Sequence, residues 1–299
     1  MNIEGVLPPI TTPFENQELA LDKMVENIQK WNETALSGYL VLGSNGESVY
    51  LAEKEKLTIV TKAREIIPAS KNMIVGTGLE STRETIRLTN LMADSGADCG
   101  LVSPPCYFKS SMQQRILADH YTAVAEASRM PILLYNVPQF TGVNLDASLV
   151  AKLSLHPNIV GLKDSSGNIA QLSEILSSTR EGFIVLVGSA PVFYPALCIG
   201  ANGGILAVAN VIPAICTDIF ALYQQGLFQE ARKLQNRMTP LAQAVTVKYG
   251  IGGLKAAMDA AGYFGGKPRL PLQAPDTEVR EEIKLLLRDL SKDSGNDKI

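Results

Sequence analysis

Residues 159–168 read IVGLKDSSGN, an apolar run of strand length that ends at a lysine and is followed at once by a Ser/Gly turn. Side chains alternate along a strand, so we expect Ile159, Gly161 and Lys163 to share one face, with Gly161 leaving space beside the lysine stem. A lysine in a confined apolar space loses hydration, which favours a neutral amine that can attack a ketone and form a Schiff base. The alternative is a lysine that ends a strand in water. That is the usual situation of lysines, so the rest of the sequence has to decide.

Strand-like apolar runs recur at intervals on both sides of this stretch. Several are apolar throughout, as is typical of a parallel sheet covered on both faces, and helical patterns fill the intervals. Eight strand–helix units predict an α/β fold, the (β/α)8 TIM barrel, with an open doubly wound sheet as the alternative. The expected strands span residues 5–10, 38–43, 72–76, 99–103, 132–136, 159–163, 184–188 and 204–208.

The strand pattern stops after the eighth run. We therefore expect residues 1–225 to form the barrel with the active site, and residues 226–299 to form a C-terminal helical region. Its helices are predicted near residues 228–247, 252–261 and 277–290. These helices would either pack on the barrel or contact another subunit.

Composition and charge argue against several classes of function. The net charge is −3 over 299 residues, with both signs interspersed, so neither nucleic acid nor a membrane surface is an expected partner. The sequence contains no evident targeting segment and no transmembrane run of about 18 apolar residues. Four cysteines without a CxxC pair indicate a reduced, cytoplasmic protein. Two histidines far apart, His120 and His156, make a metal centre unexpected.

In a barrel of this kind the active site lies at the carboxyl ends of the strands. Lys163 ends the sixth strand. Ser44 and Asn45 follow the second strand between two glycines, where backbone N–H groups can bind a carboxylate, although an ordinary glycine turn is the alternative. Tyr135, at the end of the fifth strand, either moves protons next to Lys163 or is a core tyrosine with a satisfied hydroxyl. Asp164 faces away from Lys163 and is expected to be structural.

An absence narrows the choice of substrate. No lysine or arginine occurs between Phe183 and Glu230. Barrels that bind phosphate esters or pyridoxal phosphate often do so after their seventh and eighth strands, so we expect no cationic phosphate clamp there. The GTG run at residues 76–78 is a weak dinucleotide signal, because Ser81 stands at the third glycine position. The sequence favours a small, unphosphorylated 2-oxo acid and no organic cofactor.

Four motifs occur in order along the chain: GSNGE at 43–47, PCYF at 105–108, YNVP at 135–138 and GLKDSSG at 161–167. In this order and spacing the chain resembles the dihydrodipicolinate synthase and N-acetylneuraminate lyase superfamily of class I, pyruvate-handling aldolases, over essentially its whole length. Within the superfamily it is most similar to 4-hydroxy-2-oxoglutarate aldolases. The resemblance implies a covalent imine in place of a bound cofactor, and a homodimer or homotetramer.

The resemblance also implies a role for each site residue. Lys163 would form the imine, and Tyr135 would shuttle protons. Ser44 and Tyr107 would complete a hydroxyl relay, with Tyr107 reaching into a neighbouring subunit's site. The residues implied for substrate binding are Ser44 and Asn45 at the pyruvyl carboxylate, Ser165 at the second fragment, and Ile205, whose backbone carbonyl would orient the substrate.

Departures from the family pattern bear on the substrate. Synthases carry GTTGE where this chain has GSNGE, and a second tyrosine where it has Cys106. They also carry an arginine shortly after the YNVP motif, which holds a semialdehyde substrate. Here Gln139 and Phe140 stand at that place, and Lys109 is the cation that could substitute.

These observations predict a class I aldolase, a carbon–carbon lyase that cleaves a 4-hydroxy-2-oxo acid such as 4-hydroxy-2-oxoglutarate to pyruvate and a small oxo acid or aldehyde. The alternatives are a 4-hydroxy-tetrahydrodipicolinate synthase, which condenses pyruvate with aspartate semialdehyde, and a deoxy-sugar-acid aldolase. A non-catalytic binding protein on the same scaffold is disfavoured, because it would be free to lose the intact lysine, serine and tyrosines.

Overall fold

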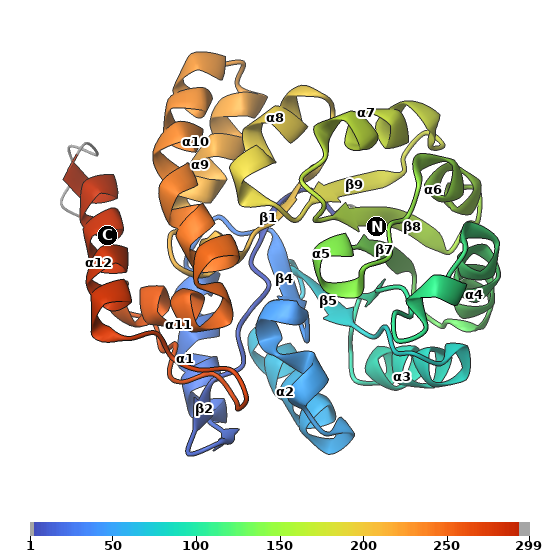
Figure 1. The fold of residues 1–299 in the computed structure, drawn as a ribbon, viewed down its shortest axis with the longest axis horizontal. Helices are drawn as coiled ribbons and strands as arrows, with labels where there is room; N and C mark the ends of the chain where they lie inside the picture. Colours follow the sequence, from blue (N-terminus) through green and yellow to red (C-terminus); the bar gives the residue numbers. More distant parts are fainter. Residues whose placement is uncertain (1–2, 293–299) are drawn as a thin grey trace.

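Eight parallel strands form a barrel at the centre of the structure, a computed structural model that describes residues 3–292 (Figure 1). They are hydrogen-bonded in the order β1-β10-β9-β8-β7-β6-β5-β4. A parallel bridge between Pro9 and Leu40 joins the first and last of them. The fold is therefore the predicted (β/α)8 barrel. Its strands are β1 (Gly5–Leu7), β4 (Gly38–Val41), β5 (Asn72–Gly76), β6 (Cys99–Val102), β7 (Ile132–Asn136), β8 (Ile159–Asp164), β9 (Ile184–Val187) and β10 (Gly203–Ile205).

Helices surround the strands (Figure 1). A short antiparallel hairpin, β2 (Phe14–Glu15) and β3 (Glu18–Leu19), precedes the first helix. The helices that follow are α1 (Leu21–Asn32), α2 (Glu53–Ile66), α3 (Thr82–Asp94), α4 (Gln114–Ala127), α5 (Pro138–Thr141), α6 (Ala147–Ser154), α7 (Ile169–Ser178), α8 (Phe193–Cys198), α9 (Pro213–Gln224), α10 (Phe228–Gln243), α11 (Gly250–Ala260) and α12 (Thr277–Lys292).

All eight predicted strands are present, although some end earlier than expected. β4 stops at Val41 because Leu42 adopts a left-handed backbone with φ 57°. The Leu42 carbonyl approaches Gly76 so closely that a side chain at Gly76 would collide with it. The last strand ends at Ile205, and residues 207–210 form a 3₁₀ turn. The sequence thus places the strands correctly, while local backbone geometry decides where each one ends.

Two apolar layers explain why the strands are apolar throughout. Leu40 and Leu133 belong to a cluster inside the barrel, whereas their neighbours Val41 and Leu134 belong to the larger core between barrel and helices. Alternate side chains of one strand therefore serve opposite layers. Burial on both faces is the arrangement expected of a parallel sheet covered by helices.

The strand that carries Lys163 is irregular near its start. β8 pairs Ile159 and Gly161 with two successive residues of β7, so Val160 is an extra residue bulged out of the ladder. Ile159 consequently packs in the outer core, whereas the bulged Val160 packs against the inner cluster. The prediction that Ile159 shares a face with Lys163 is therefore wrong, because a bulge reverses the alternation of side chains.

The C-terminal helices pack on the barrel. Met238 on α10, Leu254 on α11 and Leu287 on α12 belong to the same buried cluster as Val208, which directly follows the last strand. Figure 1 shows these helices gathered on one side of the barrel. Packing on the barrel, one of the two arrangements expected for this region, is therefore present. None of the helices within residues 3–292 is both long and apolar enough to cross a membrane.

Candidate active site

Two neighbouring strand ends bring Lys163 and Tyr135 together. Tyr135 of β7 is in register with Lys163 of β8, and Lys163 Nζ lies 4.4 Å from the centroid of the Tyr135 ring. Both side chains are buried, with 3% exposure for the lysine and 6% for the tyrosine. Within residues 3–292 no carboxylate forms an ion pair with Lys163. A buried amine without a counter-charge suits nucleophilic attack on a carbonyl.

Gly188, rather than Gly161, provides the space around the lysine. A Cβ on Gly161 would collide with the Ile184 carbonyl, so neighbouring strands fill that space and the expectation of free room there is wrong. A Cβ on Gly188, at the end of β9, would collide with Ser165 Oγ and lie 2.9 Å from Lys163 Cε. The sequence contains this signal, because Gly188 is a glycine at a strand end, but the pairing of β9 with β8 shows which side chain it faces.

The turn after β4 places Ser44 next to the tyrosine. Ser44 Oγ lies 3.4 Å from Tyr135 Oη, and either hydroxyl can donate. Ser44 and Asn45 are half-buried and begin a short 3₁₀ turn. In the described part of the chain, their backbone N–H groups donate to no protein acceptor. The Ser44 hydroxyl is therefore next to Tyr135, which is next to Lys163. The unbonded N–H groups of Ser44 and Asn45 belong to the same turn, as a carboxylate-binding turn requires.

Asp164 has the structural role that was expected. Its Oδ2 accepts a hydrogen bond from Asn136 Nδ2 at 2.8 Å. Its Oδ1 accepts from the Ser166 backbone N–H at 3.0 Å and from Ser166 Oγ at 2.6 Å. These bonds tie the ends of β7 and β8 together and fix the turn that follows Lys163.

Tyr107 lies on an exposed loop away from this group. Its side chain is 79% exposed and packs edge-on against Phe108, with ring centroids 5.0 Å apart. Glu80 holds the loop, because its Oε2 accepts the backbone N–H groups of Cys106 and Tyr107 at 2.9 and 2.8 Å. Sequence reasoning missed Glu80, although its place just beyond β5 was a usable signal. The single chain does not bring Tyr107 into hydrogen-bonding contact with Ser44.

Ser165 and Ile205 occupy the two remaining predicted positions. Ser165 is buried beside the lysine, and its backbone N–H donates to Asn136 O at 2.8 Å. Gln139 Nε2 donates to the Ser165 carbonyl at 3.0 Å, so the glutamine anchors α5 to the turn after β8. Ile205 is fully buried at the end of β10, where it pairs with Leu7. The structure therefore places both residues at carboxyl ends of barrel strands.

The position after the YNVP motif offers an aromatic ring instead of a cation. Phe140 on α5 is 69% exposed. Lys109, from the loop after β6, reaches the end of the same helix: a Cβ on Gly142 would lie 3.3 Å from Lys109 Cδ and 3.7 Å from its Nζ. Lys109, the substitute cation suggested by the sequence, therefore lies at the end of the helix that carries Phe140.

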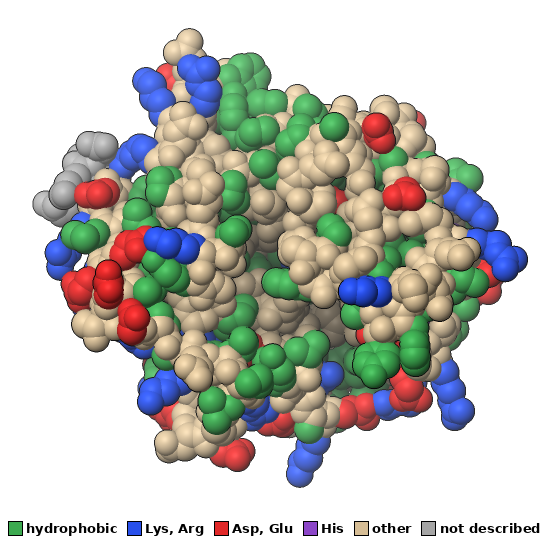
Figure 2. Space-filling model, in the orientation of Figure 1, with side chains coloured by type: hydrophobic (Ala, Val, Ile, Leu, Met, Phe, Trp, Pro, Cys, Tyr) green, Lys and Arg blue, Asp and Glu red, His purple; other side chains and the backbone are tan. Residues whose placement is uncertain are grey.

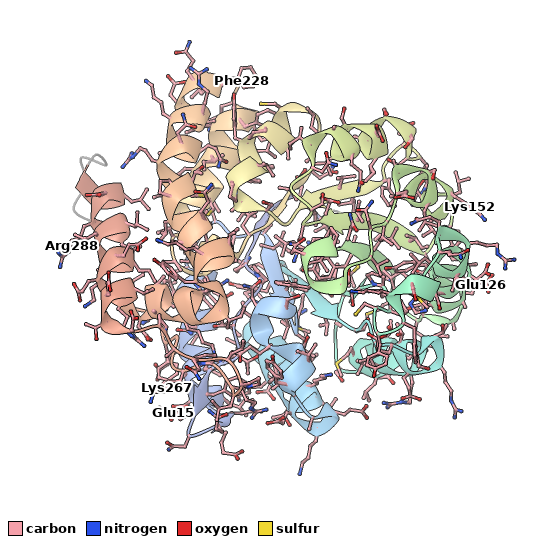
Figure 3. All side chains as sticks on the ribbon, in the orientation of Figure 1. Glu15, Glu126, Lys152, Phe228, Lys267 and Arg288 are labelled. Carbon is pink, nitrogen blue, oxygen red and sulfur yellow. The ribbon has the colours of Figure 1, made fainter. Side chains whose placement is uncertain are left out.

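The surface around the strand ends carries few charges. Figure 2 shows a hollow near the centre of the face on which α5 lies, bordered mainly by apolar and uncharged side chains. Charged side chains at the periphery, such as Glu126, Lys152 and Arg288, point outward (Figure 3). Within residues 3–292, no group of three or more His, Cys, Asp or Glu side chains is arranged to hold a metal ion.

The sequence matches the dihydrodipicolinate synthetase family over residues 2–290. The chain belongs to this family. A solved family structure, dihydrodipicolinate synthase from Thermotoga maritima, superposes with a TM-score of 0.93 at 31% identity, covering 96% of this chain and 98% of that one. The expected superfamily is thereby confirmed, and the chain is an enzyme, a lyase of this family.

Relatives named as a synthase and as an aldolase have the same sequence identity to this chain. A 4-hydroxy-tetrahydrodipicolinate synthase from Methanoculleus marisnigri is 35% identical over 288 residues, covering 95% of this chain and 98% of the relative. A probable mitochondrial 4-hydroxy-2-oxoglutarate aldolase from Emericella nidulans is also 35% identical over 288 residues, covering 94% and 93%. Overall similarity does not distinguish the synthase from the aldolase, so the substrate has to be inferred from the residues of the site.

Proposed function

We propose that this enzyme is a class I aldolase that cleaves a 4-hydroxy-2-oxo acid, such as 4-hydroxy-2-oxoglutarate, to pyruvate and a small oxo acid or aldehyde. The observation that carries the proposal is Lys163, buried at a strand end 4.4 Å from the Tyr135 ring. Cleavage of the C3–C4 bond, one carbon removed from the 2-oxo group, needs an electron sink at C2, and an iminium on a lysine provides one without any cofactor.

In the proposed reaction, Lys163 Nζ attacks C2 of the substrate and the resulting carbinolamine loses water to give an iminium. A base removes the proton of the 4-hydroxyl group, and the C3–C4 bond breaks. Its electron pair becomes the C2–C3 double bond of an enamine, while C4 leaves as a carbonyl. Protonation at C3 and addition of water then release pyruvate and return the free lysine.

The surrounding residues would orient the substrate and move the protons. Tyr135 Oη, next to the lysine and 3.4 Å from Ser44 Oγ, is the group suited to carry protons during loss of water and bond cleavage. The free N–H groups of Ser44 and Asn45 would hold the C1 carboxylate. Ser165 would contact the departing fragment, and the Ile205 carbonyl would orient the substrate. Tyr107 would join the relay from a second subunit.

The two residues after the YNVP motif, Gln139 and Phe140, favour the aldolase over the synthase. A guanidinium holds a carboxylate through two parallel charge-assisted hydrogen bonds. At the corresponding place Gln139 is already bonded to the Ser165 carbonyl, and Phe140 has no charge. A charge-assisted hydrogen bond contributes about 1.5–3 kcal/mol, so its loss corresponds to roughly 10- to 100-fold in kcat/KM. We expect hydroxyl and backbone N–H groups, including those of Ser165, to hold the distal end of the 4-hydroxy-2-oxo acid, so that aspartate semialdehyde is the poorer substrate.

Borohydride trapping tests the imine. Reduction in the presence of pyruvate should add one pyruvyl-derived mass to the peptide that contains Lys163. An adduct on another lysine, or no adduct on the wild-type protein, would contradict the proposed function.

A direct comparison of rates tests the substrate. We expect kcat/KM for cleavage of 4-hydroxy-2-oxoglutarate to exceed that for condensation of pyruvate with aspartate semialdehyde. Lys109→Ala tests the substitute cation: both substrates carry a second carboxylate, so the variant should lower the rate of the reaction in which Lys109 contacts that group and leave the other unchanged. Faster condensation would replace the aldolase with the synthase, and faster cleavage of a deoxy-sugar acid would favour that aldolase.

We also expect a homodimer or homotetramer. Tyr107 and Phe108 expose 79% and 69% of their surfaces on one loop, and exposed aromatic pairs often mark protein contacts. Light scattering should give a multiple of the 32.2 kDa chain mass. A monomer at assay concentration would exclude the proposed relay role of Tyr107. The cytoplasmic location stays a prediction.

A further inference from the structure

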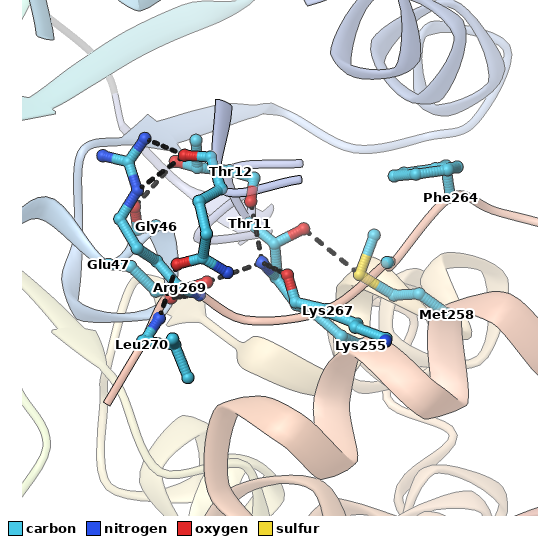
Figure 4. A network of polar contacts seen from close by, with 12 residues as sticks. Thr11, Thr12, Gly46, Glu47, Lys255, Met258, Phe264, Lys267, Arg269 and Leu270 are labelled. Atoms are coloured by element: carbon cyan, nitrogen blue, oxygen red, sulfur yellow. Dashed lines mark hydrogen bonds and ion pairs between the residues drawn. The ribbon is translucent and has the colours of Figure 1, made fainter. Parts of the chain in front are cut away.

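A fully buried ion pair joins the turn at the candidate site to the C-terminal helices. Glu47 directly follows the Ser44–Gly46 turn, and Lys255 lies on α11. Glu47 Oε1 is 2.6 Å from Lys255 Nζ, and both side chains have 0% exposure. Figure 4 shows the two side chains within one polar network. The proposed catalytic scheme gives neither residue a role.

Both members of the pair have further partners. Lys255 Nζ donates to the carbonyls of Thr12 at 2.8 Å and Lys267 at 3.2 Å, and it lies 4.6 Å from the centroid of the Phe14 ring. Glu47 Oε2 accepts the backbone N–H of Arg269 at 2.8 Å. The carboxylate is thus held at both oxygens by residues from the far end of the chain.

The same contacts hold the turn itself. Glu47 has a left-handed backbone (φ 55°, ψ 33°), which a residue other than glycine keeps only when its surroundings enforce it. Its N–H donates to Ser44 O at 3.1 Å, and Thr12 Oγ1 donates to Gly46 O at 2.6 Å. The position of the Ser44 and Asn45 N–H groups is therefore set by the residues immediately after them.

We infer that Glu47 is a positioning residue, which acts through its ion pair with Lys255 to hold the Ser44 and Asn45 N–H groups where the 2-oxo acid carboxylate binds. This inference rests on the proposed function, because it takes the turn to be the carboxylate site. It also gives the C-terminal helical region a part in substrate binding.

Glu47→Gln is the first test. The carboxylate is ion-paired with Lys255 at Oε1 and accepts the Arg269 N–H at Oε2, whereas an amide is uncharged and has a single acceptor oxygen, so it cannot replace both contacts. We expect the pyruvate concentration for half-maximal borohydride trapping to rise at least tenfold, together with a lower melting temperature. Trapping at the wild-type concentration would overturn the inference.

A double variant separates positioning from stability. Glu47→Gln with Lys255→Met removes the unpaired buried charge, so the melting temperature should recover. The tether to α11 is still missing, so half-maximal trapping should stay at least tenfold higher than in the wild type. Recovery of pyruvate affinity to within twofold of the wild type would show charge compensation only and overturn the inference.

Asp98→Asn is the matched control. Asp98 also pairs with a basic side chain, Arg64, at 3.1 Å and accepts a backbone N–H, that of Met73, at 2.7 Å. It precedes β6, at the end of the barrel opposite the site. Its loss should lower the melting temperature without changing pyruvate trapping. Failure of the wild-type protein to trap pyruvate would instead count against the proposed function.

Discussion

Lys163 and Lys255 are both buried, with 3% and 0% exposure, and each extends its nitrogen over an aromatic ring. Lys163 Nζ is 4.4 Å from the Tyr135 ring centroid, and Lys255 Nζ is 4.6 Å from that of Phe14. The two surroundings differ in charge. Lys255 has a carboxylate at 2.6 Å, whereas no carboxylate in the described residues pairs with Lys163.

The difference shows what distinguishes a candidate nucleophile from a structural lysine. Burial lowers the pKa of Lys255, while the charge of Glu47 and its hydrogen bond raise it. With the carboxylate and two backbone carbonyls as acceptors, the Lys255 nitrogen is fully engaged. Lys163 lies instead beside Gly188, whose missing side chain makes room for it, and beside the tyrosine–serine hydroxyl pair. Burial and an aromatic neighbour are common to both, so accessibility to substrate and freedom from a counter-charge make the distinction.

The largest effect is expected from Lys163→Ala. Loss of the imine-forming amine should reduce kcat by about 10⁴–10⁶-fold, as removal of other catalytic nucleophiles does. Borohydride should then trap no pyruvate, as read by intact-protein mass spectrometry. Lys255→Met is the matched control, because it removes the other buried lysine and should still form the adduct at saturating pyruvate, although its half-maximal pyruvate concentration should be raised. Normal turnover of Lys163→Ala would remove the distinction between the two lysines.

A smaller loss is expected from Tyr135→Phe. The ring that packs against Lys163 stays, but the hydroxyl next to Ser44 is lost. Since a general acid–base group contributes about 10²–10⁴-fold, kcat should fall in that range while pyruvate is still trapped. Steady-state kinetics and trapping on the same preparation measure both. Unchanged kcat with weaker pyruvate binding would make Tyr135 a binding residue.

The sequence predicts the barrel well because its signals are local. Each strand is a short apolar run at its own place in the chain, and six of the eight predicted runs end at a polar or glycine residue. Lys163 and Tyr135 are therefore found at strand ends without knowledge of distant contacts. That the two lie on neighbouring strands also follows from the fold, since β7 and β8 are consecutive strands of the barrel.

The features that the sequence does not reveal depend on contacts between distant segments. Val160 is bulged out of β8, a detail of strand pairing that alternation cannot show. Gly188 lies against Lys163 and Ser165 because β9 pairs with β8 in a particular register, which the local sequence does not give. Glu47 and Lys255 lie 208 positions apart in the numbering, and nothing in either local sequence marks them as partners. For this reason the structural role of Lys255 could not be predicted from the sequence.

Lys255→Met should cost stability. It leaves the buried Glu47 carboxylate without its cation, and breaking a buried pair in this way costs about 3–5 kcal/mol of unfolding free energy. Urea unfolding at pH 7 measures the loss. Arg129→Met is the control, because Arg129 pairs with Asp94 at the surface, with 58% and 56% side-chain exposure, and such pairs contribute about 0–1 kcal/mol. Equal losses of unfolding free energy in the two variants would mean that the buried pair contributes no more to stability than a surface pair.

A third buried nitrogen base, His120, extends the comparison to pH. Its Nδ1 lies 2.9 Å from Thr82 Oγ1, and its buried Nε2 has no partner in the described part of the chain. Burial lowers the pKa of His120 from 6.5 to about 4, with Glu80 acting weakly in the opposite direction. Like Lys163, this base is buried without an ion-paired carboxylate, so its protonation should oppose folding.

Proton linkage gives the direction and the size of this effect of pH on the free energy of unfolding. Between pH 6.5 and about 4 the unfolded chain binds a proton at His120 that the folded chain does not, so this contribution to stability is present above pH 6.5 and is lost as the pH falls. At 1.36 kcal/mol for each pKa unit, lowering the pH from 7.5 to 4.5 should remove about 2–3 kcal/mol through His120. Urea unfolding of the wild type and of His120→Gln at both pH values isolates this amount, because other groups titrate alike in the two proteins. Parallel loss of stability in both would show that His120 is protonated without penalty, and that burial without a carboxylate partner does not by itself disfavour a positive charge in this barrel.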